Sequence, residues 1–134
     1  MIVLDASAVL AWAYSDETGW PDQVMEAVGA ESAFVPCHWI LEVTNSLLTG
    51  ERRGRIDADQ HREILARVRI LPIQADPFIA EIGWQIIPAF AKRHRLTTYD
   101  AAYLELAIRL EAPLATLDQD LARAARKAGV TLFA

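Results

Sequence analysis

The stretch IVLDASA, residues 2–8, decides the fold class of this protein. Its first three residues are apolar and mostly β-branched, which is typical of a short buried parallel strand, and Asp5 ends that strand. From Ala8 to Tyr14 the spacing of apolar residues indicates a helix. A buried strand followed at once by a helix is the repeating unit of α/β folds.

The same alternation continues along the chain. Short apolar runs predict further strands at residues 33–35, 71–73, 114–116 and 130–133. Periodic apolar spacing predicts further helices at residues 21–30, 39–48, 57–71, 77–95, 101–110 and 121–128. This order predicts a three-layer α/β/α domain with a mainly parallel central sheet, and we expect residues 1–134 to form one such domain.

Three of the predicted helices carry more specific expectations. Asp57 is the expected N-cap of helix 57–71. Gly83 and Pro88 predict an interruption or kink in helix 77–95. The buried face of helix 39–48 is expected at Ile40, Val43 and Leu47.

The composition is that of a globular protein with a well-filled core. Hydrophobic residues make up 53% and charged residues 23%, which excludes disorder and low-complexity repeats. The net charge of −5 argues against a protein that holds nucleic acid by bulk electrostatics. It does not exclude a nuclease, because cations bound by carboxylates offset negative charge where a phosphate must lie.

Cysteine usage and the first apolar stretch bear on the compartment. Cys37 is the single cysteine and cannot form an internal disulfide, so we expect a buried free thiol in a reducing compartment. The apolar stretch from Ile2 to Tyr14 is interrupted by Asp5, lacks a basic leader and is too short to span a bilayer. We therefore expect a soluble cytoplasmic protein without an export segment. The tryptophans are expected to be mainly core residues: Trp12, Trp20, Trp39 and Trp84.

Four acidic residues occupy positions that this fold can bring together. Ligands of open parallel sheets bind beyond the carboxyl ends of the strands, and both Asp5 and Asp118 follow predicted strands. Asp100 begins a predicted helix, and Glu42 lies inside one among apolar neighbours. Each aspartate alone could be an ordinary N-cap. As a set the four favour a metal site, since crowded carboxylates repel without a cation, and oxygen ligands suit Mg²⁺ or Mn²⁺.

Other sites find little support in the sequence. The three histidines are dispersed, although His38 and Glu42 are four residues apart and could share a helix face. The motifs GxxxxGK[ST] and GxGxxG are missing, which disfavours P-loop and dinucleotide sites. A haloacid dehalogenase-like phosphatase needs a second aspartate where this chain has Ser7. A receiver domain needs paired acids after the first strand and a late lysine, and residues 130–134 contain no lysine.

The sequence resembles the PIN-domain ribonucleases, and in particular the VapC toxins of type II toxin/antitoxin pairs. The resemblance spans nearly the whole chain in the order of the family. It is carried by five segments, residues 2–8, 35–45, 52–56, 98–107 and 114–121.

The resemblance implies a site, a cofactor and a reaction. The acidic quartet Asp5, Glu42, Asp100 and Asp118 is then expected to hold one or two Mg²⁺ or Mn²⁺ ions and to hydrolyse RNA phosphodiester bonds. Four further residues are expected to support this centre or its substrate: Ser7, Asn45, Thr116 and, as an auxiliary candidate, Asp120. The arginines Arg52, Arg53 and Arg55 could contact the RNA backbone, although a solvated turn explains them equally well.

The resemblance also implies partners, and it leaves alternatives open. A small VapB-like antitoxin is expected to cover the acidic groove, and the toxin is expected to form a homodimer. A PIN-like module that binds RNA or protein without cleavage is the main alternative, but such a module should have lost acids that this chain retains. A PIN nuclease of RNA processing is the other, and an adjacent small reading frame for a DNA-binding partner would argue against it.

Overall fold

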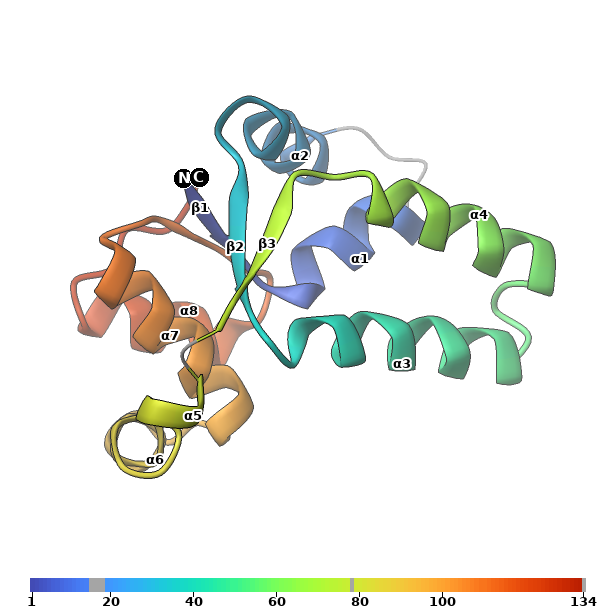
Figure 1. The fold of residues 1–134 in the computed structure, drawn as a ribbon. Helices are drawn as coiled ribbons and strands as arrows, with labels where there is room; N and C mark the ends of the chain where they lie inside the picture. Colours follow the sequence, from blue (N-terminus) through green and yellow to red (C-terminus); the bar gives the residue numbers. More distant parts are fainter. Residues whose placement is uncertain (15–18, 78, 134) are drawn as a thin grey trace.

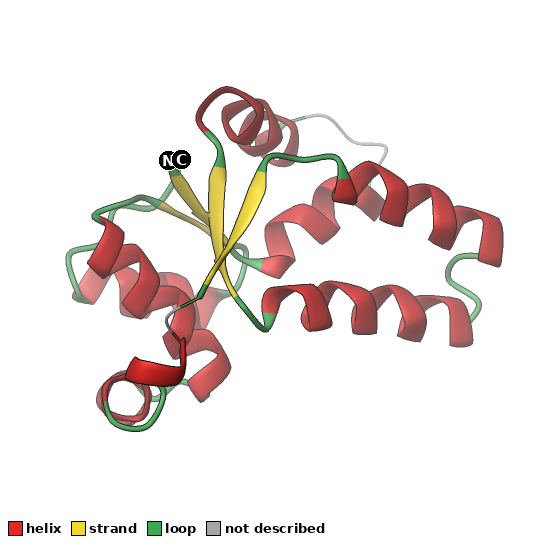
Figure 2. Ribbon diagram, viewed as in Figure 1, coloured by secondary structure: helices red, strands yellow, loops and turns green. Residues whose placement is uncertain are grey.

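The computed structural model describes residues 1–14, 19–77 and 79–133. Its centre is a parallel sheet of β1 (Ile2–Leu4), β2 (Ala33–Pro36), β3 (Ile73–Asp76) and β4 (Leu114–Ala115), in the order β3-β2-β1-β4 (Figure 2). Val3 pairs with Phe34 on one side and with Leu114 on the other. Strands β2 and β3 therefore lie on one side of β1, and β4 lies on the other side, so the strand order reverses at β1.

Helices cover both faces of this sheet. They are α1 (Ala6–Tyr14), α2 (Trp20–Glu31), α3 (Trp39–Arg52), α4 (Ala58–Arg69), α5 (Ile79–Ile82), α6 (Ile86–His94), α7 (Thr98–Leu110) and α8 (Gln119–Lys127). Figure 1 shows α1, α3 and α4 on one side of the sheet and α7 and α8 on the other. The prediction of a three-layer α/β/α fold with a parallel sheet is confirmed.

The core lies around β1 and α7. All three residues of β1 are fully buried, and in α7 the run of residues 101–107 is buried without interruption. This run is explained by the position of α7, which contacts the sheet on one side and α6 and α8 on others. Burial of each large apolar side chain stabilises the fold by about 1.5–3 kcal/mol, so these two elements fix the frame on which the acids stand.

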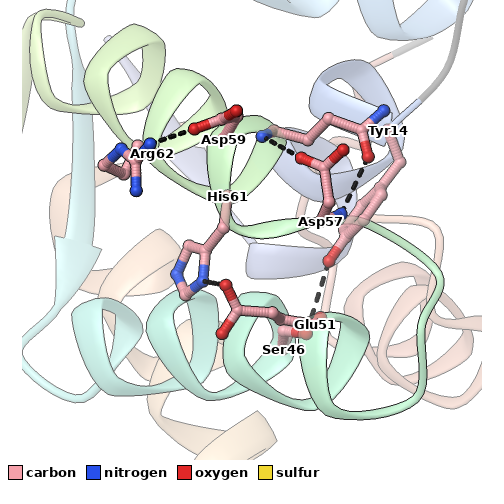
Figure 3. Close-up of polar contacts among 8 residues, drawn as sticks. Tyr14, Ser46, Glu51, Asp57, Asp59, His61 and Arg62 are labelled. Atoms are coloured by element: carbon pink, nitrogen blue, oxygen red, sulfur yellow. Dashed lines mark hydrogen bonds and ion pairs between the residues drawn. The ribbon is translucent and has the colours of Figure 1, made fainter.

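Several local predictions are confirmed and others are wrong. Asp57 caps α4, because its side chain accepts a hydrogen bond from the Gln60 backbone N–H at 2.8 Å while the Gln60 side chain accepts one from the Asp57 N–H (Figure 3). Region 77–95 is not one helix, and the interruption predicted at Gly83 is confirmed, since α5 ends at Ile82 and α6 begins at Ile86. Pro88 lies in the first turn of α6, where its missing N–H costs nothing. Residues 130–133 form no strand, and only an isolated bridge joins Leu132 to Leu114.

The buried face of α3 differs from the predicted one by one residue. Ile40 is 53% exposed, and the face against the core is formed by Trp39, Val43, Leu47 and Gly50. The burial predicted for two other residues is also wrong. Cys37 is exposed, because it lies in the turn beyond β2, and Trp84 is 87% exposed between α5 and α6. Trp39 is buried as expected, and Trp12 and Trp20 are partly buried against the core.

No helix in the described part of the chain is both long and apolar enough to cross a bilayer.

Candidate active site

The acidic residues gather where the strand order of the sheet reverses. Asp5 follows β1 directly, and Asp118 follows β4, so both stand beyond the carboxyl ends of the two strands that flank the switch in strand order. Glu42 lies in the first turn of α3, which begins after β2, and Asp100 lies in the first turn of α7. A crevice at such a switch point is the usual ligand site of open parallel sheets.

Asp5 is held rigidly at the centre of this group. The residue is buried, with 5% of its surface exposed, and its Oδ2 accepts hydrogen bonds from Ser7 Oγ at 2.7 Å and from Thr116 Oγ1 at 2.6 Å. Burial raises the pKa of Asp5, the two hydroxyl donors oppose that rise, and the nearby charge of Asp118 adds to it. Ser7 and Thr116 thus lie behind Asp5 and orient its carboxylate.

The same two hydroxyls tie Asp5 to the loop after β4. The backbone N–H of Leu117 donates to Ser7 Oγ at 2.9 Å, and that of Asp118 donates to Thr116 Oγ1 at 3.0 Å. The bonds from Leu117 to Ser7 and from Thr116 to Asp5 join residues more than a hundred positions apart in the sequence. They fix the position of Asp118 relative to Asp5.

Asp118 caps the N-terminus of its helix, whereas Asp100 does not. Asp118 is the N-cap of α8, and its Oδ1 accepts a hydrogen bond from the Leu121 N–H at 2.8 Å, so the ordinary role expected for it is confirmed. For Asp100 that expectation is wrong. Thr97 is the N-cap of α7, and its hydroxyl accepts the Asp100 N–H at 3.1 Å. The Asp100 carboxylate is therefore not used as a cap.

Glu42 is held by Tyr103, which sequence reasoning did not assign to the site, and His38 lies beside it on the same helix face, as the spacing of four residues predicts. Tyr103 Oη donates a hydrogen bond of 2.5 Å to Glu42 Oε1, and His38 Nε2 lies 3.3 Å from the same oxygen. Burial raises the pKa of Glu42, the bond from Tyr103 lowers it, and the charge of Asp5 raises it. Tyr103 stands three residues after Asp100 and thus on nearly the same helix face, a spacing from which its role could have been found.

His38 packs between this carboxylate and an aromatic ring. Its imidazole meets the Tyr103 ring edge-on, with centroids 5.4 Å apart, and burial lowers its pKa. Its Nε2 is buried and makes no hydrogen bond within the described residues, since the approach to Glu42 lacks the required geometry. A buried nitrogen without a partner is costly and is an opening for a ligand.

Asp100 is where the negative charges of the site act together. Burial and the charges of Asp118, Asp5, Glu42 and Asp120, in that order of importance, raise the pKa of Asp100 to about 6. Because charges must be near one another to act in this way, the four predicted carboxylates share one electrostatic site. In this arrangement a bound cation would lower the energy of all of them.

The carboxylate oxygens of the site suit a hard divalent cation, but they are not arranged around a common point as the ligands of a bound metal ion would be. Within residues 1–14, 19–77 and 79–133, no three histidine, cysteine, aspartate or glutamate side chains are close enough to hold a metal ion as they stand. The reason is visible in their bonds, because Asp118 is turned to α8, Glu42 to Tyr103, and Asp5 to its two hydroxyls. The carboxylate oxygens, and the raised pKa of Asp100 among the neighbouring negative charges, fit Mg²⁺ or Mn²⁺, since these ions prefer oxygen ligands.

The other predicted residues divide into two groups. Asp120 is exposed in the first turn of α8 and forms an ion pair with Arg123 at 2.9 Å, so it lies at the rim of the site. Asn45 lines a groove of about 440 Å³ that starts at Glu42 and follows α3 to Arg53 and Arg55. Arg52 belongs to the described residues but does not line this groove.

Known proteins are similar to this chain in sequence and in fold. The family model of the PIN domain matches residues 2–127. The chain is 33% identical over 120 residues to Ribonuclease VapC9 of Mycobacterium tuberculosis, which covers 88% of this chain and 86% of that relative. It is 30% identical over 126 residues to Ribonuclease VapC3 of Pyrobaculum aerophilum, covering 90% and 92% of the two chains. The crystal structure of PAE2754 from Pyrobaculum aerophilum matches with a TM-score of 0.63 at 26% identity, covering 92% of this chain and 78% of that chain.

Proposed function

Because the chain belongs to the PIN domain family and to its VapC ribonucleases, we propose that it is a metal-dependent endoribonuclease that hydrolyses phosphodiester bonds of RNA. We place it as the toxin of a type II toxin/antitoxin pair, which inhibits translation by cutting an RNA in the cytoplasm. The observation that carries this proposal is that four carboxylates, from Asp5, Glu42, Asp100 and Asp118, gather at the switch in strand order, where burial and the neighbouring charges raise the pKa of Asp100 to about 6. Carboxylates that repel one another in this way favour the binding of cations, and the bound cations can in turn neutralise a phosphate.

We assign the metal to Asp5, Glu42, Asp100 and Asp118. When bound there, Mg²⁺ or Mn²⁺ supplies an activated water and stabilises charge on the attacking and leaving oxygens. The chain itself orients the ligands. Ser7 and Thr116 hold one oxygen of Asp5, and Tyr103 holds one oxygen of Glu42, so both carboxylates are fixed in position before a cation binds.

Partners follow from the same proposal. A VapB-like antitoxin is expected to bind over the acids, with a basic side chain that replaces the cation as their counter-charge. The homodimer is also a proposal. The exposed Trp84 is a suitable anchor for it, because aromatic side chains dominate the energetics of protein interfaces.

The decisive experiment is cleavage of total cellular RNA by purified protein, free of antitoxin, with Mn²⁺, with Mg²⁺ and with EDTA. We expect discrete cuts in the presence of metal, mapped by sequencing of the new ends, and none in EDTA. Asp100→Asn and Asp5→Asn should abolish the cuts while the circular dichroism spectrum stays that of the wild type. The exposed Glu26→Gln on α2 is the matched control, since it removes one carboxylate outside the site and should cut normally.

Two outcomes would reject the proposal. Folded wild-type protein that binds RNA but makes no cuts with either metal would favour a binding module. Cuts that persist in EDTA and in Asp100→Asn would show that another nuclease is present or that the site lies elsewhere. Growth arrest on expression, relieved by co-expression of an adjacent small reading frame, separates the toxin from a nuclease of RNA processing.

A further inference from the structure

The three arginines that follow α3 are not equivalent. Arg53 and Arg55 line the groove that begins at Glu42, whereas Arg52, the last residue of α3, is not among the described residues that form it. The walls between the two ends are polar and uncharged, and they consist of Asn45, Ser46, Thr49 and the bare backbone at Gly50. One end of the groove is therefore acidic, and the other is cationic.

Arg55 is held in place by an aromatic ring. Its guanidinium carbon lies 4.1 Å from the centroid of the Tyr14 ring. Tyr14 is itself anchored, because its hydroxyl donates a hydrogen bond of 3.3 Å to the Ser46 carbonyl of α3 (Figure 3). An arginine side chain loses rotamer freedom when it is fixed, so the contact with Tyr14 reduces the entropy that Arg55 would lose on binding a ligand.

Gly50 makes this arrangement possible. A Cβ atom at position 50 would lie 2.7 Å from Tyr14 Oη, which is closer than real Cβ atoms approach. A larger residue there would push the tyrosine away from α3 and would move the ring beneath Arg55. The contact among Tyr14, Gly50 and Arg55 thus joins α1, α3 and the turn after α3.

The acids near these arginines have other partners. Glu51 lies 3.5 Å from His61, Asp57 caps α4, and Asp59 is paired with Arg62 (Figure 3). Residues 51–69 carry six of the 13 basic residues in a chain with a net charge of −5. The turn after α3 is therefore a locally basic surface on an acidic protein.

The groove has the reach of a short stretch of nucleic acid. Eleven helical positions separate Glu42 from Arg53, which corresponds to about 16 Å along α3. A phosphodiester strand with its scissile phosphate at the acids would pass the hydroxyl and amide groups and bring a later phosphate to the arginines. Half to two-thirds of the hydrogen bonds in protein–DNA complexes go to phosphate and sugar, from arginines and polar side chains such as these.

We propose that Arg53 and Arg55, with Arg55 positioned by Tyr14, form a subsite for the sugar-phosphate backbone of the RNA strand that leaves the acidic site along α3. Arg52 takes no part in it. This inference rests on the proposed function and adds to it a path for the substrate. The subsite serves affinity and register, not the chemical step.

The first test measures binding without cleavage. Every variant carries Asp100→Asn, and the probe is a fluorescein-labelled single-stranded RNA that spans the mapped cleavage site. Fluorescence anisotropy is measured over a series of KCl concentrations. We expect Arg53→Ala and Arg55→Ala each to weaken binding about fivefold to tenfold and to reduce the slope of log K against log salt by about 0.7, the value for one lost contact with single-stranded nucleic acid. Arg52→Ala, the matched control, should change affinity less than twofold.

A second variant tests the stacking of Arg55. Arg55→Lys keeps the charge but loses the planar group that lies on Tyr14. Its salt slope should equal that of the parent, while its affinity falls to a value between those of the parent and Arg55→Ala. Urea unfolding of each variant establishes that the comparison is made between folded proteins.

Shortening the RNA tests the direction of the path. Nucleotides are removed one at a time from each end of the probe. On one side only, the parent should lose affinity in a single step when the strand no longer reaches Arg55, and Arg55→Ala should show no step at that length.

The outcomes separate this inference from the proposed function. If the wild type cuts RNA with metal but alanine at positions 52, 53 and 55 has the same effect on affinity and salt slope, the subsite is wrong and the nuclease stands. If the wild type neither cuts nor binds RNA, the proposed function itself fails. If both ends of the RNA can be shortened without a step, no strand follows α3 and the subsite is again wrong.

Discussion

Asp100 is the site residue whose ionised carboxylate is most strongly disfavoured by burial and by the neighbouring negative charges. Its carboxylate is not needed as a helix cap, it is partly buried, and the charges of four other acids act on it. A group with a pKa of about 6 in the folded chain and about 3.9 when unfolded destabilises the fold wherever both states are ionised. The destabilisation is present above pH 6 and is relieved as the pH falls through 6 toward 4, because the folded state then takes up the proton first.

The first prediction concerns this pH dependence. In EDTA, Asp100→Asn should raise the melting temperature at pH 7 by about 4 °C, which corresponds to about 1 kcal/mol after allowance for solvent screening. The gain should shrink as the pH falls below 6 and vanish near pH 4. Thermal unfolding followed by circular dichroism measures both effects. A variant that melts at or below the wild type at pH 7 would contradict the raised pKa, and Glu26→Gln on α2 should show no such pattern.

At the scale of the elements, an ionic clasp joins α7 to the end of β3. The Arg109 guanidinium donates to both oxygens of Asp76, at 2.6 and 3.2 Å, and to both oxygens of Glu105, at 2.8 and 3.1 Å. Both carboxylates are buried, and their hydrogen bonds and charges raise the pKa of Arg109. Since α7 also carries Asp100 and Tyr103, the clasp helps to set the position of these residues against the sheet.

The second prediction tests the clasp. Arg109→Ala leaves two buried carboxylates without their counter-charge and should lower the free energy of unfolding by about 2 kcal/mol at pH 7. This is less than the roughly 3–5 kcal/mol for a fully buried pair, because the arginine is partly exposed. Arg123→Ala breaks an exposed pair with Asp120 and should cost about 0.5 kcal/mol or less. Urea unfolding measures the two variants. Equal losses would mean that the clasp contributes no more than an ordinary surface pair.

At the scale of the whole molecule, metal binding should be linked to folding. The four carboxylates come from widely separated parts of the sequence, so the unfolded chain has no equivalent site. A ligand that binds only the folded state at a hundred times its Kd stabilises it by about 2.7 kcal/mol. The stability of the fold therefore reports the metal independently of RNA cleavage.

The third prediction follows from this linkage. Saturating Mn²⁺ should raise the melting temperature of the wild type by several degrees, and Asp5→Asn should lose most of this shift. Glu26→Gln should keep the shift, because its side chain is exposed on α2. Differential scanning calorimetry over a Mn²⁺ series measures it. A shift of the same size in Asp5→Asn would place the cation away from the acids.

The sequence by itself determined the frame of the molecule. Local patterns predicted the strand at residues 2–4, the cap at Asp57 and the alternation that makes a parallel sheet, because apolar period and turn chemistry act over a few residues. The sheet rule then placed Asp5 and Asp118 at one edge. The same local reasoning failed for residues 130–133 and for Ile40, where burial depends on what the rest of the chain leaves open.

Only the tertiary structure decided which side chains of the site are bonded to one another. The bond from Tyr103 to Glu42 spans 61 residues, and the bond from Thr116 to Asp5 spans 111. It also decided that Arg53 and Arg55, but not Arg52, face the groove from Glu42. The physical reason is that hydrogen bonds and side-chain directions depend on distances of a few tenths of an ångström, which helix packing sets and which no local pattern encodes.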